Sequence, residues 1–207
     1  GMFCSRLMCP ECNRHSYAFD PFTLLQISIP IPESGNCGPD MELKECIKNF
    51  SSEETLSESD RWKCKSCKEK VLAKKTMHIW SLPPVLVIHL KRLVYVPVKV
   101  HGKPMDMTKK VKLETKINFS LDDLDMTEFC HEYRKKKNYK YELYAVTNHS
   151  GGSYGGHYYS YCKNDMNNMW YKYDDETVHH IPDDRIADEL ITGKAYMLFY
   201  KRIYPHA

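Results

Sequence analysis

The sequence predicts an α+β fold with an antiparallel main sheet, and three features of the pattern support this prediction. Two aromatic segments, 157–161 and 170–173, are separated by a short polar turn, which is the arrangement of an antiparallel pair of strands. Apolar runs of strand length lie at 85–90 and 196–200. A helical pattern is clear only at 43–50, so helices are expected to be few.

The N-terminal half contains one predicted strand and one predicted helix. Residues 25–29 alternate between apolar and polar side chains and end at Pro30, as a half-buried strand does. After a turn at 35–39, Asp40 is expected to cap a helix. The apolar positions of that helix follow the spacing i, i+3, i+4, i+7 and are Leu43, Cys46, Ile47 and Phe50. This face is expected to pack on the core, with Cys46 as a packing residue.

The C-terminal half adds strands and one short helix. The continuous apolar run at 85–90 predicts a strand that is covered on both faces. Residues 122–134 fit neither a strand nor a helix clearly. Asp183 or Asp184 is expected to cap a final short helix, which Gly193 would close before the last apolar strand.

Composition is typical of a single globular domain. The 207 residues are 42% hydrophobic and 12% aromatic, which is enough for one substantial core with a protruding subdomain. No apolar run approaches the roughly 20 residues that cross a bilayer, and no signal-peptide pattern opens the chain. No membrane insertion is therefore predicted. The net charge of +3 is too small to indicate a polyanionic partner.

A basic run at 134–137 raises nucleic-acid binding as an alternative. Nucleic-acid-binding modules distribute basic residues along a face and combine them with aromatic stacking partners. This run stands alone before Tyr139 and is most simply a solvated loop. No nucleic-acid partner is expected.

Four of the nine cysteines form two Cys-x-x-Cys pairs. An odd number of cysteines without a secretion signal favours metal ligation over a disulfide framework, and therefore a reducing compartment, the cytoplasm or the nucleus. A predicted strand, turn and helix separate the pairs, so the pairs are expected to meet as the tips of separate hairpins. They would then hold a structural Zn²⁺ that is closed to water; redox-active or unbound thiols are the alternative. The pairs are Cys9 with Cys12 and Cys64 with Cys67.

The segment 155–161 indicates a histidine with an orienting carboxylate. Antiparallel pairing of the two aromatic strands would place His157 at the start of one strand and Asp174 at the end of its neighbour. A carboxylate that accepts from one imidazole nitrogen leaves the other nitrogen able to take a proton from a nucleophile. The alternative is a strand-end histidine with purely structural hydrogen bonds. Gly155 and Gly156 favour the chemical role, because glycine lets backbone or substrate approach the ring closely.

Six segments together carry a resemblance to a known family. They are CPEC at 9–12, FDPF at 19–22, LPPVLVIHLKR at 82–92, SGGSYGGHY at 150–158, WYKYDDETV at 170–178 and AYMLFYKR at 195–202. In this order they resemble the fingers, central palm strand, histidine box and last strand of the ubiquitin-specific proteases, a papain-like family of cysteine deubiquitinases. The resemblance extends from about Leu7 to Arg202.

The resemblance implies a papain-like cysteine protease fold, with an antiparallel palm sheet and fingers that carry a zinc ribbon. Residues 1–207 would be a partial catalytic domain, with fingers at about 5–80 and a palm at about 81–203. Asp174 would orient His157, and Asp175 would assist near the oxyanion region. Alternation along a strand would point the two carboxylates to opposite faces, so that only one can orient the ring.

One part of the family pattern is absent. The family carries its nucleophile in a cysteine box, and the nearest imitation here is GNCG at 35–38. We reject Cys37 as the nucleophile because Pro39 and the surrounding turn residues place it in a loop between the two cysteine pairs. The thumb with the catalytic cysteine is therefore expected upstream of Gly1, as a missing segment of the same protein, and the chain alone is expected to be inactive.

The predicted function is that of a deubiquitinating thiol protease, which hydrolyses the bond after the C-terminal glycine of ubiquitin. Ubiquitin and ubiquitinated proteins are the expected partners. A narrow slot for the glycine tail is expected at Gly151, Gly152, Gly155 and Gly156, with Tyr158 as a further substrate contact. The alternative is a catalytically inactive scaffold or pseudoenzyme that binds ubiquitin.

Overall fold

The computed structural model describes residues 1–32, 36–98, 107–131 and 138–204. They form the predicted α+β fold, which is mostly sheet with few helices. The basic run at 134–137 lies outside the described residues. None of the helices in the described part of the chain has the length and apolar composition that a bilayer-spanning helix requires.

The largest sheet has eight strands and carries most of the C-terminal half. In order from one edge they are β17 (Thr177–Ile181), β16 (Trp170–Asp174), β15 (Gly156–Lys163), β14 (Lys140–Gly151), β18 (Ala195–Arg202), β9 (Val85–Lys91) and β3 (Leu24–Ser28), and β13 (Leu124–Asp125) pairs with β14 off this path. Neighbours are antiparallel, as predicted, except that β3 runs parallel to β9.

A second sheet of four strands and three two-stranded pairs complete the β structure of the described residues. The second sheet contains β2 (His15–Pro21), β1 (Met2–Met8), β8 (Lys74–Ser81) and β5 (Glu54–Thr55). The pairs are β10 (Leu93–Val98) with β11 (Met107–Lys112), β4 (Met41–Glu42) with β12 (Ile117–Asn118), and β6 (Trp62–Lys63) with β7 (Lys70–Val71).

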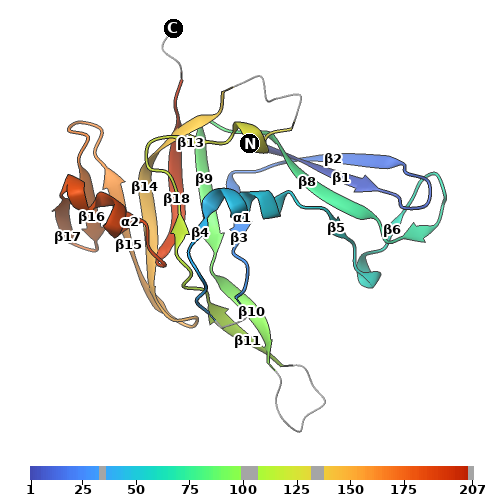
Figure 1. Cartoon of the computed structure of the whole chain (residues 1–207), viewed down its shortest axis with the longest axis horizontal. Helices are drawn as coiled ribbons and strands as arrows, with labels where there is room; N and C mark the ends of the chain where they lie inside the picture. Colours follow the sequence, from blue (N-terminus) through green and yellow to red (C-terminus); the bar gives the residue numbers. More distant parts are fainter. Residues whose placement is uncertain (33–35, 99–106, 132–137, 205–207) are drawn as a thin grey trace.

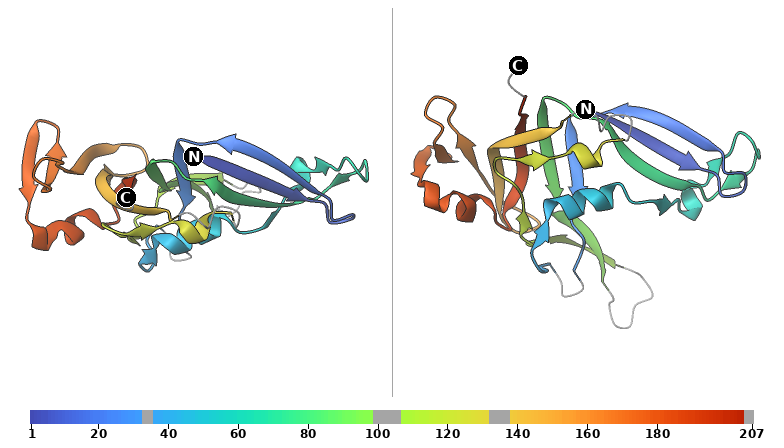
Figure 2. Two further views of the ribbon diagram at one scale, coloured as in Figure 1. Left: turned by 90° about the horizontal axis from the view of Figure 1, so that it is seen from above. Right: turned by 45° about the horizontal axis from the view of Figure 1, so that its top comes forward.

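The two sheets give the molecule an elongated shape (Figure 1). The four-stranded sheet extends away from one side of the large sheet, with β6 near its far end, and β15, β16 and β17 lie on the opposite side. The two further views in Figure 2 show the same arrangement. The β10–β11 hairpin projects from the large sheet in a third direction (Figure 1).

The main core lies between the large sheet and α1 (Leu43–Phe50). Leu43, Cys46 and Ile47 are buried on the inner face of α1, and Phe50 packs against the core from its edge, as the helical spacing predicts. Fully buried aliphatic side chains of this kind each stabilise the fold by about 1.5–3 kcal/mol. Cys46 is therefore a packing residue, and burial raises the pKa of its thiol.

The prediction that Asp40 caps α1 is wrong. The helix begins at Leu43 after an extended Glu42, and no side chain caps it. The chain continues as a strand beyond Asp40, because Met41 pairs with Ile117 in the β4–β12 ladder. Asp40 instead forms an ion pair with Lys116 at 3.4 Å.

The prediction that β9 is covered on both faces is also wrong. Leu86, Ile88 and Leu90 are fully buried, whereas Val85 is 47% exposed and the alternate face of the strand is only half-buried. The continuous apolar run therefore predicted more burial for one face of β9 than the structure shows.

The last helix differs in a similar way from its prediction. A 3-10 turn at Asp183–Arg185 leads into α2 (Ile186–Leu190), neither aspartate caps it, and it ends before Gly193. The ambiguous segment 122–134 contains β13 and a 3-10 turn at Thr127–Phe129, and its last three residues lie outside the described part.

Candidate functional site

His157 and Asp174 meet at the outer part of the large sheet. Ser160 pairs with Tyr173 at the end of the β15–β16 ladder, and His157 and Asp174 lie just beyond this pair. His157 and Asp174 therefore share one face of the sheet and are diagonal to each other. Nε2 of His157 lies 2.6 Å from Oδ1 of Asp174, which is a short hydrogen bond. The side chains are 48% and 27% exposed, so the imidazole is open to an incoming group.

This geometry leaves one nitrogen of His157 available for chemistry. Nε2 is engaged by Asp174, so the neutral ring that donates through Nε2 presents Nδ1 as an acceptor. The hydrogen bond to Asp174 raises the pKa of His157, and the negative charge of Asp175 raises it further. The pair can therefore accept a proton at Nδ1 and hold the resulting imidazolium.

Lys172 is a third member of the arrangement that the sequence reasoning missed. Its Nζ lies 2.8 Å from Oδ2 of Asp174 and 4.5 Å from the centre of the Tyr159 ring. Hydrogen bonds from Lys172 and then His157 lower the pKa of Asp174 and keep it ionised. The signal was available, because Lys172 lies two positions before Asp174 and so shares its face of β16.

Asp175 does not point away from the histidine as alternation predicted. Strand β16 ends at Asp174, and Asp175 adopts a left-handed conformation with φ of 50°. A carboxylate oxygen of Asp175 consequently lies within 4.8 Å of a ring nitrogen of His157 and of an oxygen of Asp174. Only Asp174 forms the hydrogen bond, so the prediction that one carboxylate orients the ring agrees with the geometry.

The four glycines before His157 fall into two kinds. Gly151 has φ of 117°, and a Cβ there would lie 2.6 Å from Cα of Gly156. A Cβ on Gly156 would collide with the His149 ring. These two glycines are needed by the β14–β15 hairpin itself, whereas a Cβ on Gly152 or Gly155 would meet nothing within 4 Å, so both leave open space above the backbone.

Tyr158 lies next to His157 in sequence but belongs to another cluster. Its ring packs 4.7 Å from His149 and 5.8 Å from Tyr196, measured between ring centres. Because side chains alternate along β15, this cluster lies on the face opposite His157. Tyr158 nevertheless remains 51% exposed.

The two cysteine pairs meet as predicted, at the tips of separate hairpins. Cys9 and Cys12 lie in the turn between β1 and β2, and Cys64 and Cys67 lie in the turn between β6 and β7. The turns have the same geometry, since the residue after each pair, Asn13 or Lys68, is left-handed and donates its N–H to the carbonyl of the first cysteine.

The four sulfur atoms lie close together, and two of their separations match those of a tetrahedral metal site. Sγ of Cys9 lies 3.9 Å from Sγ of Cys67, Sγ of Cys12 lies 3.8 Å from Sγ of Cys64, and all four atoms lie within 4.8 Å of one another. Tetrahedral metal–sulfur bonds of about 2.3 Å place sulfurs about 3.8 Å apart. Backbone N–H groups of Cys67 and Ser66 lower the pKa of Cys64 to about 7, whereas hydrogen bonds among the thiols raise the pKa of Cys67, so in the absence of a metal ion Cys64 is the thiol that ionises more readily. The cluster could therefore hold a metal ion.

Three of the remaining cysteines lack the features of an activated thiol. Burial raises the pKa of Cys4, Cys46 and Cys162. Among the described residues, the only side-chain hydrogen bond of His157 is to Asp174, so no cysteine thiol is paired with the imidazole. Cys37 is exposed in an irregular segment, in agreement with its predicted loop position.

Comparisons with known proteins agree on one family. A family profile described as "Ubiquitin carboxyl-terminal hydrolase" matches residues 1–200. Ubiquitin carboxyl-terminal hydrolase 15 of Homo sapiens is 40% identical over 164 residues, which cover 79% of this chain and 15% of that protein. Ubiquitin carboxyl-terminal hydrolase 2 of Gallus gallus is 34% identical over 205 residues, which cover 99% of this chain and 52% of that protein. The chain thus spans about half or less of these relatives.

Solved structures give the same result. A chain of the yeast SAGA DUBm superposes with a TM-score of 0.76 at 28% identity, covering 100% of this chain and 41% of that one. A chain of the SAGA Ubp8/Sgf11/Sus1/Sgf73 DUB module bound to ubiquitin aldehyde gives 0.74 at 27% identity, covering 100% and 42%. Both likenesses extend over the whole of this chain and include the strands that hold His157 and Asp174.

The geometry predicts an elevated pKa for His157 that depends on Asp174. In an NMR titration of the imidazole, Asp174→Asn should lower this pKa toward the ordinary value of about 6.5. Asp20→Asn, on the exposed β2 strand of the other sheet, is the matched control and should leave it unchanged. Because folding raises this pKa, the ion pair stabilises the fold below about pH 6.5 and loses that effect as the pH rises through the folded-state pKa. An unchanged His157 titration in Asp174→Asn would contradict the pairing.

Proposed function

Because the chain belongs to the ubiquitin carboxyl-terminal hydrolase family, we propose that it forms part of the catalytic domain of a thiol-dependent deubiquitinase. The substrate bond is the one after the C-terminal glycine of ubiquitin. The observation that carries this proposal is the 2.6 Å hydrogen bond between His157 and Asp174, which leaves Nδ1 available at the exposed start of β15. This is the orientation that a histidine needs to serve a nucleophile.

The proposal assigns the nucleophile to a cysteine outside these 207 residues, in a thumb segment of the same protein. Two observations support this assignment. No thiol is hydrogen-bonded to His157 in the part of the chain that the structure describes, and burial disfavours the thiolate at Cys4, Cys46 and Cys162. The chain itself would supply the base, its orienting carboxylate and much of the substrate surface.

The catalytic cycle follows from the free nitrogen. Nδ1 of His157 takes the proton of the cysteine thiol, and the sulfur attacks the carbonyl carbon of the terminal glycine. Nδ1–H then protonates the leaving amine as the C–N bond breaks, which leaves a thioester. Nδ1 next takes a proton from water as its oxygen attacks the thioester carbon. The C–S bond then breaks, which releases the carboxylate of ubiquitin, and Nδ1–H returns its proton to the sulfur. Asp174 keeps Nε2 engaged throughout, and Lys172 keeps Asp174 ionised.

The proposed roles of the neighbouring residues differ in how directly they act. Gly152 and Gly155 have open space above their backbone and fit a slot for a ubiquitin tail. Gly151 and Gly156 would border that slot while shaping its hairpin. Asp175, with its carboxylate near His157, would assist in the oxyanion region. Tyr158 would contact substrate through its exposed half.

We assign a structural zinc ion to Cys9, Cys12, Cys64 and Cys67. The two sulfur–sulfur distances of 3.8 and 3.9 Å and the matched turns support this choice. When bound, the ion would cross-link two hairpin tips whose own core is small, with Cys9, Cys64, Val71 and Ala73 as its buried members. The domain would then divide into fingers at about 5–80 and a palm at about 81–203, although β3 is a strand of the palm sheet and α1 packs on that sheet. Reduced thiols of this kind fit the cytoplasm or nucleus.

Metal binding should be part of folding in the fingers. Elemental analysis of the purified chain should find one zinc ion per molecule. Cys64→Ser should release the ion and increase amide exchange in β6 and β7, whereas Cys162→Ser, on β15, should change neither. Absence of stoichiometric metal, with all four thiols open to titration, would remove the zinc assignment.

The catalytic assignment predicts a specific loss of activity. In a polypeptide that includes the cysteine box, His157→Ala should reduce hydrolysis of a ubiquitin-amide substrate by at least about 10²–10⁴-fold. Asp174→Asn should cost less, because Asp175 can partly replace its charge. His180→Ala, on the exposed β17 strand, is the control and should retain activity.

Near-normal turnover by His157→Ala would refute the assignment. If the wild-type polypeptide with a cysteine box binds ubiquitin and does not hydrolyse it, the protein is instead a ubiquitin-binding scaffold. The circular dichroism spectrum of each variant establishes that a loss of activity does not reflect unfolding.

A further inference from the structure

Strand β14 extends beyond its neighbour β18. The β14–β18 ladder ends where Asn148 pairs with Ala195, the first residue of β18. The N–H of His149 still finds a partner, the carbonyl of Lys194, at 2.9 Å. Beyond that point, no strand of the described residues follows along this edge of β14. The carbonyl groups of His149 and Gly151, which point to the same edge, would lack a ladder partner.

The ammonium group of Lys112 takes the place of the missing strand. Its Nζ donates to the carbonyl of His149 at 2.7 Å and to the carbonyl of Gly151 at 2.8 Å. The side chain is only 6% exposed. An ammonium has three donors and no fixed fork, so it can bridge two carbonyls spaced two residues apart.

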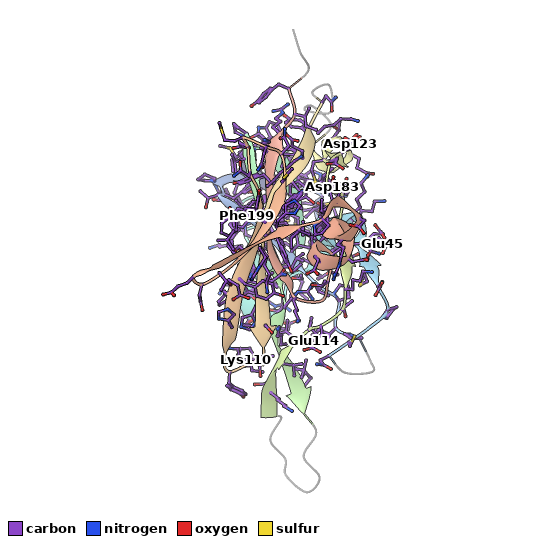
Figure 3. All side chains as sticks on the ribbon, turned by 90° about the vertical axis from the view of Figure 1, so that its left-hand side faces the viewer. Glu45, Lys110, Glu114, Asp123, Asp183 and Phe199 are labelled. Atoms are coloured by element: carbon purple, nitrogen blue, oxygen red, sulfur yellow. The ribbon has the colours of Figure 1, made fainter. Side chains whose placement is uncertain are left out.

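Arg92 fixes the position of Lys112. Its guanidinium is fully buried and donates to the carbonyls of Leu113 and Thr115, directly after β11, and to that of Ala195 at the start of β18. The N–H of Leu113 returns a hydrogen bond to the carbonyl of Arg92 at 2.7 Å. These hydrogen bonds connect the segment that follows Lys112 to Arg92, and through Arg92 to the start of β18. Figure 3 labels Lys110 and Glu114, which flank Lys112 two residues away on either side, near the base of the β10–β11 hairpin.

The other edge of β14 holds the proposed catalytic histidine. In the β14–β15 ladder Ser150 pairs with His157, and Gly151 pairs with Gly156. The two carbonyls that Lys112 holds therefore belong to the residues on either side of the partner of His157. A shift of this strand end would move His157 relative to Asp174, which sits on a different strand.

We propose that Lys112 is a positioning residue, which clamps the free end of β14 and thereby holds His157 in register with Asp174. The inference deepens the proposed function, because it concerns the residue that the proposal names as the base. Within the described residues, Lys112 has two carbonyl partners and no salt bridge. A buried ammonium without a carboxylate partner is costly. Burial accordingly lowers the pKa of this lysine, while the charge of Glu114 opposes that shift.

The test compares three variants of the chain by NMR. Lys112→Met keeps the length of the side chain and removes every donor, whereas Lys112→Arg retains donors for the two carbonyls. Lys109→Met makes the same chemical change at an exposed position of β11 and is the control. The readouts are the pKa of the His157 imidazole and the downfield Nε2–H signal that reports its hydrogen bond to Asp174.

Lys112→Met should lower the pKa of His157 toward about 6.5 and broaden or remove the hydrogen-bonded signal. Lys112→Arg should keep the His157 pKa and the Nε2–H signal close to those of the wild type, and Lys109→Met should leave both unchanged. If Lys112→Met loses stability but its folded form keeps the wild-type His157 titration, Lys112 is only structural and the proposal is overturned. Should Lys112→Met not fold, Lys112→Gln, which has a shorter side chain and an uncharged donor group, should give an intermediate His157 pKa. Failure of both variants to fold would likewise overturn the positioning role.

These readouts need no turnover of ubiquitin. A chain that shows the Lys112 dependence but belongs to an inactive protein would refute the proposed function and leave the clamp intact. Conversely, an active enzyme whose His157 ignores Lys112 would refute the clamp alone.

Discussion

The register of strand β14 is the constraint on which the rest of the site depends. This strand runs for twelve residues and pairs with β18 along one edge and β15 along the other. A slip of one residue would exchange its buried and exposed faces, so the core locks its register. Because β14 pairs with β15 and β15 pairs with β16, this register also sets the positions of His157 and Asp174. The two residues lie on the same face, with Nε2 of His157 2.6 Å from Oδ1 of Asp174. Packing in the core thus fixes a hydrogen bond at the surface.

The features that oppose stability gather around this strand end. Arg92 and Lys112 are buried cations whose hydrogen bonds go to carbonyls, Gly151 is left-handed, and Asp175 is left-handed without being glycine. Natural sequences usually break local rules where function requires it, and the surrounding structure compensates. Here the compensation comes from hydrogen bonds that tie β11 to β14 and β18. The cluster of four cysteines, at the far end of the other sheet, has a separate small core.

Local patterns in the sequence predicted strands at the positions of β3, β9, β15, β16 and β18, the meeting of the two cysteine pairs and the approach of His157 to Asp174. They did not predict β14 or the strands of the second sheet. The strands and the approach of His157 to Asp174 depend on residues that are close in sequence. The cysteine pairs, whose contacts join residues 52 and 58 positions apart, were expected to meet because four thiolates suit one metal ion. The errors arose where a distant segment pairs with the chain or where a turn interrupts the alternation along a strand. Pairing of Met41 with Ile117 displaced the start of α1, and a left-handed turn brought Asp175 back toward His157. No local signal marks Lys112, because its partners lie 37 and 39 residues away.

We propose above all that His157, oriented by Asp174, activates a cysteine that lies in another segment of the protein. The most direct measurement treats the folded 207-residue chain with ubiquitin that carries a C-terminal electrophile, alone and with a separate segment containing the cysteine box. We expect no labelling of the chain alone and labelling of the added cysteine in the mixture. Mass-spectrometric detection of ubiquitin on Cys4, Cys37, Cys46, Cys130 or Cys162 would contradict the account, because the nucleophile would then lie within this chain.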